Sequence, residues 1–119
     1  VFVDQLDKVQ VGGTYSRVDE KLRAVYESSR AVAKRHDCMV WAVSQASYDA
    51  HNRQEIDFSM LENSKTGKAA EADIIIGIGK NFGDEEEYIR HLCVSKNKLS
   101  GWHGTITCRI DIQKARYLP

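Results

Sequence analysis

The chain alternates between short, continuously apolar runs and longer polar or amphipathic stretches. Apolar runs occupy residues 1–3, 38–43 and 74–79, each too short for a helix and typical of a strand buried on both faces. Between the first two runs, apolar side chains recur at helical spacing, which predicts an amphipathic helix over about residues 17–36 with Ser16 as its N-cap. A weaker helix is expected over 59–72, after a polar loop.

The C-terminal part has the pattern of an antiparallel hairpin. Strands are expected over 88–95 and 105–112, joined by a turn that contains Gly101 and Gly104, with a short edge strand over 115–118. Strands separated by helices and followed by a hairpin predict an α/β fold, a mainly parallel sheet with helices and a C-terminal antiparallel β-hairpin, in a single domain over 1–119. We therefore expect the centres of the apolar runs to be almost fully buried: Val3, Val40, Val43, Ile75 and Val94.

Composition and charge narrow the possible partners. The 17 basic and 17 acidic residues of this 119-residue chain cancel, so no global field draws it toward nucleic acid or a membrane, and any DNA contact must be local. Three cysteines stand singly in strand-like runs, which fits reduced thiols in the cytoplasm. No apolar run approaches the ~20 residues that span a bilayer. The opening of the chain directly on a strand indicates a portion of a longer protein.

The first apolar run ends in Asp4, which gives the form of a Walker B motif. A carboxylate at the tip of a buried strand can hold a magnesium ion through water against nucleotide phosphates. An aspartate that caps a strand end is the simpler interpretation of this residue alone. Because sites in parallel sheets gather beyond the carboxyl ends of the strands, other polar residues at such ends are informative.

The run that ends in Ser44-Gln45 resembles the strand of DnaB-type replicative helicases and RecA-like recombinases that ends in Ser-Gln. The segment Glu71-Ala72-Asp73, which leads into the third run, is also similar to these families. The resemblance implies that Gln45 lies near the γ-phosphate and reports nucleotide state, a role that suits an amide because it can exchange donor and acceptor partners. In isolation, Gln45 would be a residue that begins a loop.

Just upstream of that third run, a polar segment occupies the place of the family's DNA-contacting loop and short helix. The resemblance implies contacts with single-stranded DNA from Asn63, Ser64, Lys65, Gly67 and Lys68. The Arg-Glu-Ser-Gly sequence usual in the helicases is absent here. A solvated, lysine-bearing helix start is the alternative interpretation.

The hairpin turn has the most specific pattern. The sequence from Lys96-Asn97-Lys98 to Gly101 and Gly104-Thr105 resembles the helicase pattern Lys-x-Arg-x-x-Gly-x-x-Gly-Thr. The resemblance implies that Lys96 and Lys98 bind the γ-phosphate of a neighbouring subunit. Lys98 stands where the helicases have arginine, and Lys-Asn-Lys is the form found in RecA-like recombinases. An exposed basic hairpin would explain the lysines but not the glycine spacing.

Together the motifs are similar to the C-terminal portion of a RecA-like P-loop NTPase core of the DnaB type. This resemblance implies ATP and Mg²⁺ as cofactors, with Asp4 as metal ligand and Asp4, Gln45, Lys96 and Lys98 as catalytic residues, Asp4 and the lysines also binding the nucleotide. It implies a hexameric ring on single-stranded DNA in the cytoplasm of a bacterial or phage-infected cell. The chain has no Gly-x-x-x-x-Gly-Lys-Ser/Thr phosphate loop, so we expect it to be inactive alone. A recombinase fragment and a non-enzymatic interaction domain on an ATPase scaffold are the alternatives.

Overall fold

The computed structural model describes residues 1–62, 65–85 and 87–119, which form two compact units. One unit comprises Val1–Ser47 and Leu61–Ala72, and the other comprises Tyr48–Met60 and Asp73–Pro119. No helix in the described part of the chain is both long enough and apolar enough to cross a membrane.

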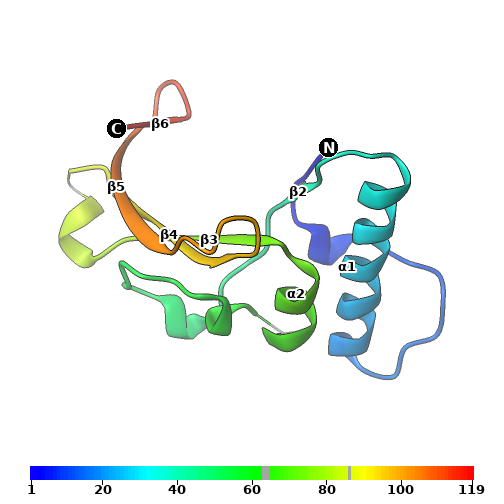
Figure 1. Ribbon diagram of the computed structural model, residues 1–119. Helices are drawn as coiled ribbons and strands as arrows, with labels where there is room; N and C mark the ends of the chain where they lie inside the picture. The colour runs from blue at the N-terminus through cyan, green and yellow to red at the C-terminus, as the bar shows by residue number, and fades with distance from the viewer. Residues whose placement is uncertain (63–64, 86) are drawn as a thin grey trace. The chain divides into compact units, whose positions relative to one another are not determined.

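The first unit combines two short parallel strands with two helices. Strand β1 (Phe2–Val3) pairs in parallel with β2 (Trp41–Ala42), and a short 3-10 helix, η1 (Leu6–Lys8), follows β1. Helices α1 (Val18–Arg35) and α2 (Lys65–Glu71) pack side by side (Figure 1). The predicted amphipathic helix is therefore confirmed, and its buried face contributes Leu22 and Val25 to the core.

The beginning of α1 differs from the prediction. Arg17, and not Ser16, is the N-cap, and its side chain makes no capping hydrogen bond. The Ser16 hydroxyl instead donates to a Glu20 carboxylate oxygen at 3.2 Å, while the Arg17 guanidinium pairs with Asp19 at 2.9 Å. Acidic residues in the first turn still stabilise the helix, because they interact favourably with its dipole.

The second unit is built on a four-stranded antiparallel sheet. Its strands β3 (Ile74–Gly79), β4 (Ile89–Asn97), β5 (Gly104–Asp111) and β6 (Arg116–Leu118) pair in chain order (Figure 1). Three 3-10 helices, η2 (Tyr48–Ala50), η3 (Phe58–Met60) and η4 (Phe82–Glu85), accompany the sheet. The antiparallel hairpin of β4 and β5 confirms the prediction from the sequence.

The prediction of a mainly parallel sheet is confirmed for β1 and β2 and not for β3. Strand β3 pairs antiparallel with β4, because the connection over residues 80–88 is shorter than the crossover of about a dozen residues that parallel strands need. The fold is therefore mixed α/β, with a parallel pair of strands and an antiparallel sheet.

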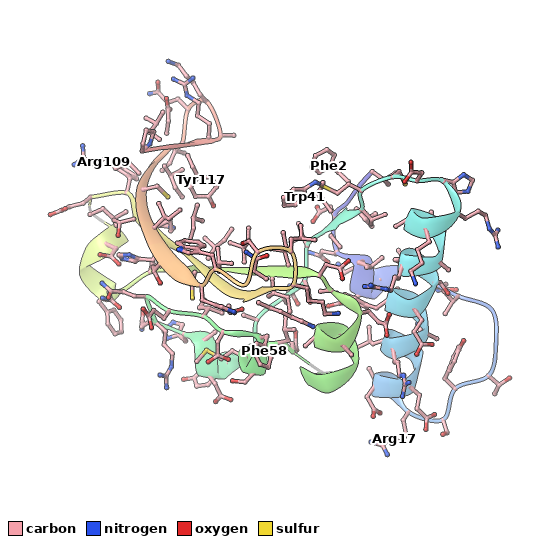
Figure 2. The ribbon with its side chains drawn as sticks, viewed as in Figure 1. Phe2, Arg17, Trp41, Phe58, Arg109 and Tyr117 are labelled. Carbon is pink, nitrogen blue, oxygen red and sulfur yellow. The ribbon has the colours of Figure 1, made fainter. Side chains whose placement is uncertain are left out.

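The predicted burial of the apolar runs is wrong. Val43 is 58% exposed, and the other four expected core positions are partly buried. Phe2 and Trp41 stack on each other with ring centroids 6.3 Å apart while remaining 85% and 47% exposed (Figure 2). In β3 exposure alternates along the strand, so its apolar run covers one protected face and one open face. The buried apolar side chains among the described residues lie elsewhere, at Leu6, Leu22, Val25, Ala50, Ala69 and Cys108.

Candidate functional site

Asp4 and Gln45 lie beyond the carboxyl ends of two neighbouring strands. Because β1 and β2 run in parallel, with Phe2 opposite Trp41, their carboxyl ends share one edge. Hydrogen bonds continue past the strands, from Val43 N to Val3 O at 3.0 Å and from Leu6 N to Val43 O at 3.2 Å. The side chains of Asp4 and Gln45 are exposed at this edge. The strand adjacency matches the prediction, and the chemical roles of the two residues stay predictions.

Behind this edge lies a polar cluster that the sequence did not predict. We call it the Lys68 network, and it consists of Asp7 in η1, Tyr26 in α1, Ser44 after β2 and Lys68 in α2. The Lys68 ammonium donates to Asp7 Oδ2 at 2.6 Å and to Ser44 Oγ at 3.0 Å. Ser44 Oγ donates to Asp7 Oδ2 at 2.9 Å, and Tyr26 OH donates to Asp7 Oδ1 at 2.8 Å.

Lys68, which the resemblance assigns to the DNA segment, is buried in the first unit, and its role toward DNA stays a prediction. Its side chain is 1% exposed, so its ammonium is not presented to DNA phosphates in this structure. A buried ammonium is tolerated when a carboxylate and further acceptors replace its water, and here Asp7 and Ser44 do so. The ammonium also lies 5.8 Å from the centre of the Tyr26 ring, within range of a cation–π interaction.

The environment of the network also perturbs Tyr26. Burial raises the pKa of Tyr26, and the Asp7 carboxylate that accepts its hydrogen bond raises this pKa further. The phenol therefore stays protonated at neutral pH and remains a donor to Asp7.

The other residues predicted to contact DNA are placed as follows. Asn63 and Ser64 lie outside the described residues, Lys65 begins α2 and Gly67 lies within it. The Arg30 guanidinium of α1 donates to the backbone oxygen of Glu71 at the end of α2. This contact holds the end of α2, and the Lys68 network holds its middle.

In the second unit, Lys96 lies near the end of β4 and Lys98 directly follows the strand. Lys96 is opposite Ile75 and partly buried. The register shifts between Ile75 and Ile76, so Ser95 occupies a β-bulge just before the lysines. Lys98 N donates to Asp73 O at 2.8 Å, and its ammonium lies 3.7 Å from Asp73 Oδ1. Both side chains of this ion pair are nearly half exposed, so the attraction is weak.

The turn after Lys98 is organised by Asn97. Its amide oxygen accepts from Leu99 N at 3.1 Å and Ser100 N at 3.2 Å, and its amide nitrogen donates to Ser100 Oγ at 2.8 Å and Trp102 O at 3.2 Å. Gly101 has a φ of 71°, a conformation that favours glycine. Gly101 therefore suits the predicted turn, whereas Gly104, also expected in the turn, is the first residue of β5 and has no positive φ. The role of Asn97 was not predicted, because the pattern of lysines and glycines around it assigns it none.

A second polar cluster in this unit surrounds His91, which is 8% exposed. Its ring nitrogens lie 3.1 Å from Thr107 Oγ1 and 3.0 Å from Asp84 Oδ2. The backbone N–H of Asn81 donates to Asp84 Oδ2 at 2.6 Å, and this bond, followed by the His91 contact, lowers the pKa of Asp84. The cluster joins η4 to β4 and β5.

The described residues contain no group of three or more His, Cys, Asp and Glu side chains suited to holding a metal ion. Magnesium in nucleotide sites is held differently, by one or two carboxylates together with water and substrate phosphates. A single exposed Asp4 carboxylate at a strand end fits that kind of site.

The fold is similar to those of two solved structures, although the sequence matches no known family. No protein-family model and no curated protein matches the sequence. Among solved structures, the chain is similar to one described as an ATPase domain, with a TM-score of 0.83 and 20% identity over 98% of this chain and 43% of that chain. It is also similar to a DnaB-like replicative helicase studied with its interactions with primase, with a TM-score of 0.83 and 19% identity over 98% of this chain and 29% of that one.

At these identities the similarities show the fold alone: the chain folds like part of that ATPase domain and like part of that DnaB-like replicative helicase. The chain spans less than half the length of each of these two structures.

Proposed function

We propose that this chain forms part of the ATPase domain of a DnaB-type replicative helicase, which couples ATP hydrolysis to translocation on single-stranded DNA. The observation that carries this proposal is the fold similarity, which extends over 98% of the chain at a TM-score of 0.83. The shared edge beyond β1 and β2 supports it, because Asp4 and Gln45 follow the two strands there.

In the proposed site, Asp4 would hold Mg²⁺ through water, and the metal would offset the charge of the nucleotide phosphates. Gln45 would sense the γ-phosphate through its amide, which can change hydrogen-bond partners without a change in charge. Lys96 and Lys98 would act on the nucleotide of a neighbouring subunit in a hexameric ring. Single-stranded DNA would bind to the segment from Asn63 to Gly67, with Lys65 supplying charge. We place this assembly in the cytoplasm.

A recombinase of the RecA type is the second candidate. The observation that favours it is Lys98, because the helicase pattern has arginine at this position and the recombinases have lysine. A non-enzymatic interaction domain is the third, since the chain itself contains no phosphate-loop sequence. For the same reason we expect the isolated 119-residue chain not to hydrolyse ATP.

The test uses the complete protein that carries this chain, assayed for ATP hydrolysis, unwinding of forked DNA and strand exchange. We expect DNA-dependent hydrolysis with unwinding, and a loss of hydrolysis of about 100-fold or more in Asp4→Asn. Asp37→Asn is the matched control, since Asp37 is exposed and its φ of 46° suits asparagine. Strand exchange without unwinding would favour the recombinase. Absence of hydrolysis in the unchanged protein would favour the interaction domain.

A further inference from the structure

The Lys68 network is closed, because its polar groups satisfy one another. Asp7 accepts three hydrogen bonds, two at Oδ2 from Lys68 and Ser44 and one at Oδ1 from Tyr26. The Lys68 ammonium in turn has two oxygen partners and an aromatic face. These contacts join four separate parts of the first unit: η1, α1, α2 and the segment that follows β2.

Such a network resists displacement of any one element. If α2 alone moved away, the Lys68 ammonium and the Asp7 carboxylate, which are 1% and 23% exposed in the packed structure, would each lose their oppositely charged partner. An unpaired charge in such surroundings is strongly unfavourable. Movement of α2 is therefore expected to move the segments that carry Asp7 and Ser44 with it.

The network also lies directly beside the residues of the proposed site. Ser44 immediately precedes Gln45, and Asp7 follows Asp4 by three positions. The other side of the DNA segment is attached to the same stretch, because Glu62 N donates to Gln45 O at 3.2 Å and Ala46 pairs with Leu61. The residues on both sides of the DNA segment are thus attached to residues 44–46.

We infer that Lys68 is a positioning residue that couples the nucleotide-sensing end of β2 to the DNA-binding segment. A shift of Gln45 would be transmitted to one end of the segment through Glu62 and to the other through Ser44 and Lys68. Lys68 itself makes no contact with DNA in this arrangement. The inference rests on the proposed function, because it assigns the regulation of that same site.

The first experiment tests the network without relying on activity. The melting temperature of the complete protein is measured for Lys68→Met, Asp7→Asn and the double variant, with the exposed Lys34→Met on α1 as control. Each single variant should melt well below the control, and the double variant should lose less than the sum of the two, because it leaves no unpaired charge. Additive losses would contradict a direct Asp7–Lys68 pair and overturn the inference.

The second experiment separates coupling from direct DNA contact. It measures DNA affinity against salt concentration, and the ratio of DNA-stimulated to basal ATP hydrolysis, at a temperature where every variant is folded. Lys68→Met should leave the salt slope unchanged, whereas loss of a phosphate contact would reduce it by about 0.7. A reduced slope in Lys68→Met would identify a DNA contact and overturn the inference.

Ser44→Ala is a second test variant, used in case Lys68→Met does not fold. It removes two hydrogen bonds of the network and retains the Asp7–Lys68 ion pair. We expect the stimulation ratio to fall in both Ser44→Ala and Lys68→Met by about 2- to 30-fold, the range for mutations along coupled networks. If both variants had the same stimulation ratio as the unchanged protein, the coupling would be overturned and the proposed function would not. Absence of stimulation in the unchanged protein would overturn the proposed function and the coupling with it.

Discussion

Gly77 and Gly79 on β3 have no room for a side chain, because the backbone of residues 53–56 lies against them. A Cβ atom at Gly77 would lie 2.1 Å from the backbone oxygen of Ile56, and one at Gly79 would lie 2.2 Å from that of Gln54. Neither residue has the positive φ that would require glycine for conformational reasons. Their role is therefore steric, and it lets residues 53–56 cover one face of β3 at backbone distance.

Gly77→Ala is expected to destabilise the protein by about 1–3 kcal/mol, because a backbone atom, which cannot rotate aside, occupies the space of the new methyl group. The free energy of unfolding from urea denaturation is the measurement. Gly83→Ala is the matched control, since a Cβ atom there meets nothing within 4 Å. Equal stability of the two variants would show that residues 53–56 do not cover Gly77.

Asp84 is expected to make stability depend on acid pH. Its pKa is lowered in the folded protein, mainly by the hydrogen bond from Asn81 N and also by His91 and Arg90. A carboxylate with a lowered folded pKa stabilises the protein above its unfolded pKa, and this stabilisation is lost as pH falls through the folded pKa. The loss should therefore occur below about pH 4.

Asp84→Asn should flatten this dependence, because asparagine does not titrate. The urea concentration at the midpoint of unfolding is measured at several pH values between about pH 5 and about pH 3. The same measurement on Asp19→Asn, on the surface of α1, is the control. A steeper acid loss in Asp84→Asn than in the unchanged protein would contradict the lowered pKa.

At the residue scale, the sequence shows which side chains are charged or polar, but it does not show which residues surround them. Lys68 was expected on the surface, since a lysine in a polar segment is ordinarily solvated. Its partner Asp7 is 61 positions away and Ser44 is 24 positions away. No local sequence pattern predicts that residues at such separations are neighbours, so only the structure shows the Lys68 network.

At the element scale, periodicity over a long segment proved the more dependable signal. Helix α1 was predicted to within one residue at each end, because its apolar positions recur over several turns. The short apolar runs indicated the strands but not their burial or their pairing. Continuous apolarity does not distinguish a strand covered on both faces from one that leaves a face open, and β3 is of the second kind.

The β4–β5 turn should depend on Asn97 more than on its neighbours. Asn97→Ala removes the acceptor of Leu99 N and Ser100 N, each hydrogen bond contributing about 1 kcal/mol, or roughly a fivefold change in an equilibrium constant. Amide hydrogen exchange at Leu99 and Ser100 should therefore accelerate by that order. His103→Ala, an exposed substitution in the same turn, is the control. Unchanged exchange in Asn97→Ala would refute this role of Asn97.

At the scale of the whole molecule, the order of elements carried more information than residue identity. Matching structures at 19% and 20% identity share the fold at a TM-score of 0.83, and the sequence motifs had indicated that same class. The fold says less about the chemistry of the proposed site, because Asp4 and Gln45 belong to one compact unit and Lys96 and Lys98 belong to the other. The resemblance, and not the fold, assigns the lysines to a neighbouring subunit.

The weak ion pair between Lys98 and Asp73 is compatible with such a role. The two side chains are 44% and 49% exposed, and pairs this open contribute little to stability. Breaking this ion pair therefore costs little in itself. The bulge at Ser95 and the hydrogen bonds of Asn97 fix the backbone on both sides of the lysines.

If the lysines act on a neighbour's nucleotide, two inactive variants of the complete protein should restore each other's activity. One subunit carries Lys96→Ala and Lys98→Ala, and the other carries Asp4→Asn. In a mixed ring, some interfaces combine an intact Asp4 with intact lysines from the adjacent subunit, so hydrolysis should recover in part, whereas each variant alone stays inactive. Lys114→Ala, in the turn between β5 and β6, is the control and should neither abolish hydrolysis nor need rescue. The measurement is steady-state ATP hydrolysis across mixing ratios, with co-assembly verified by mixing each variant with unchanged subunits. A mixture that co-assembles and remains inactive would show that the lysines do not act on a neighbour's nucleotide.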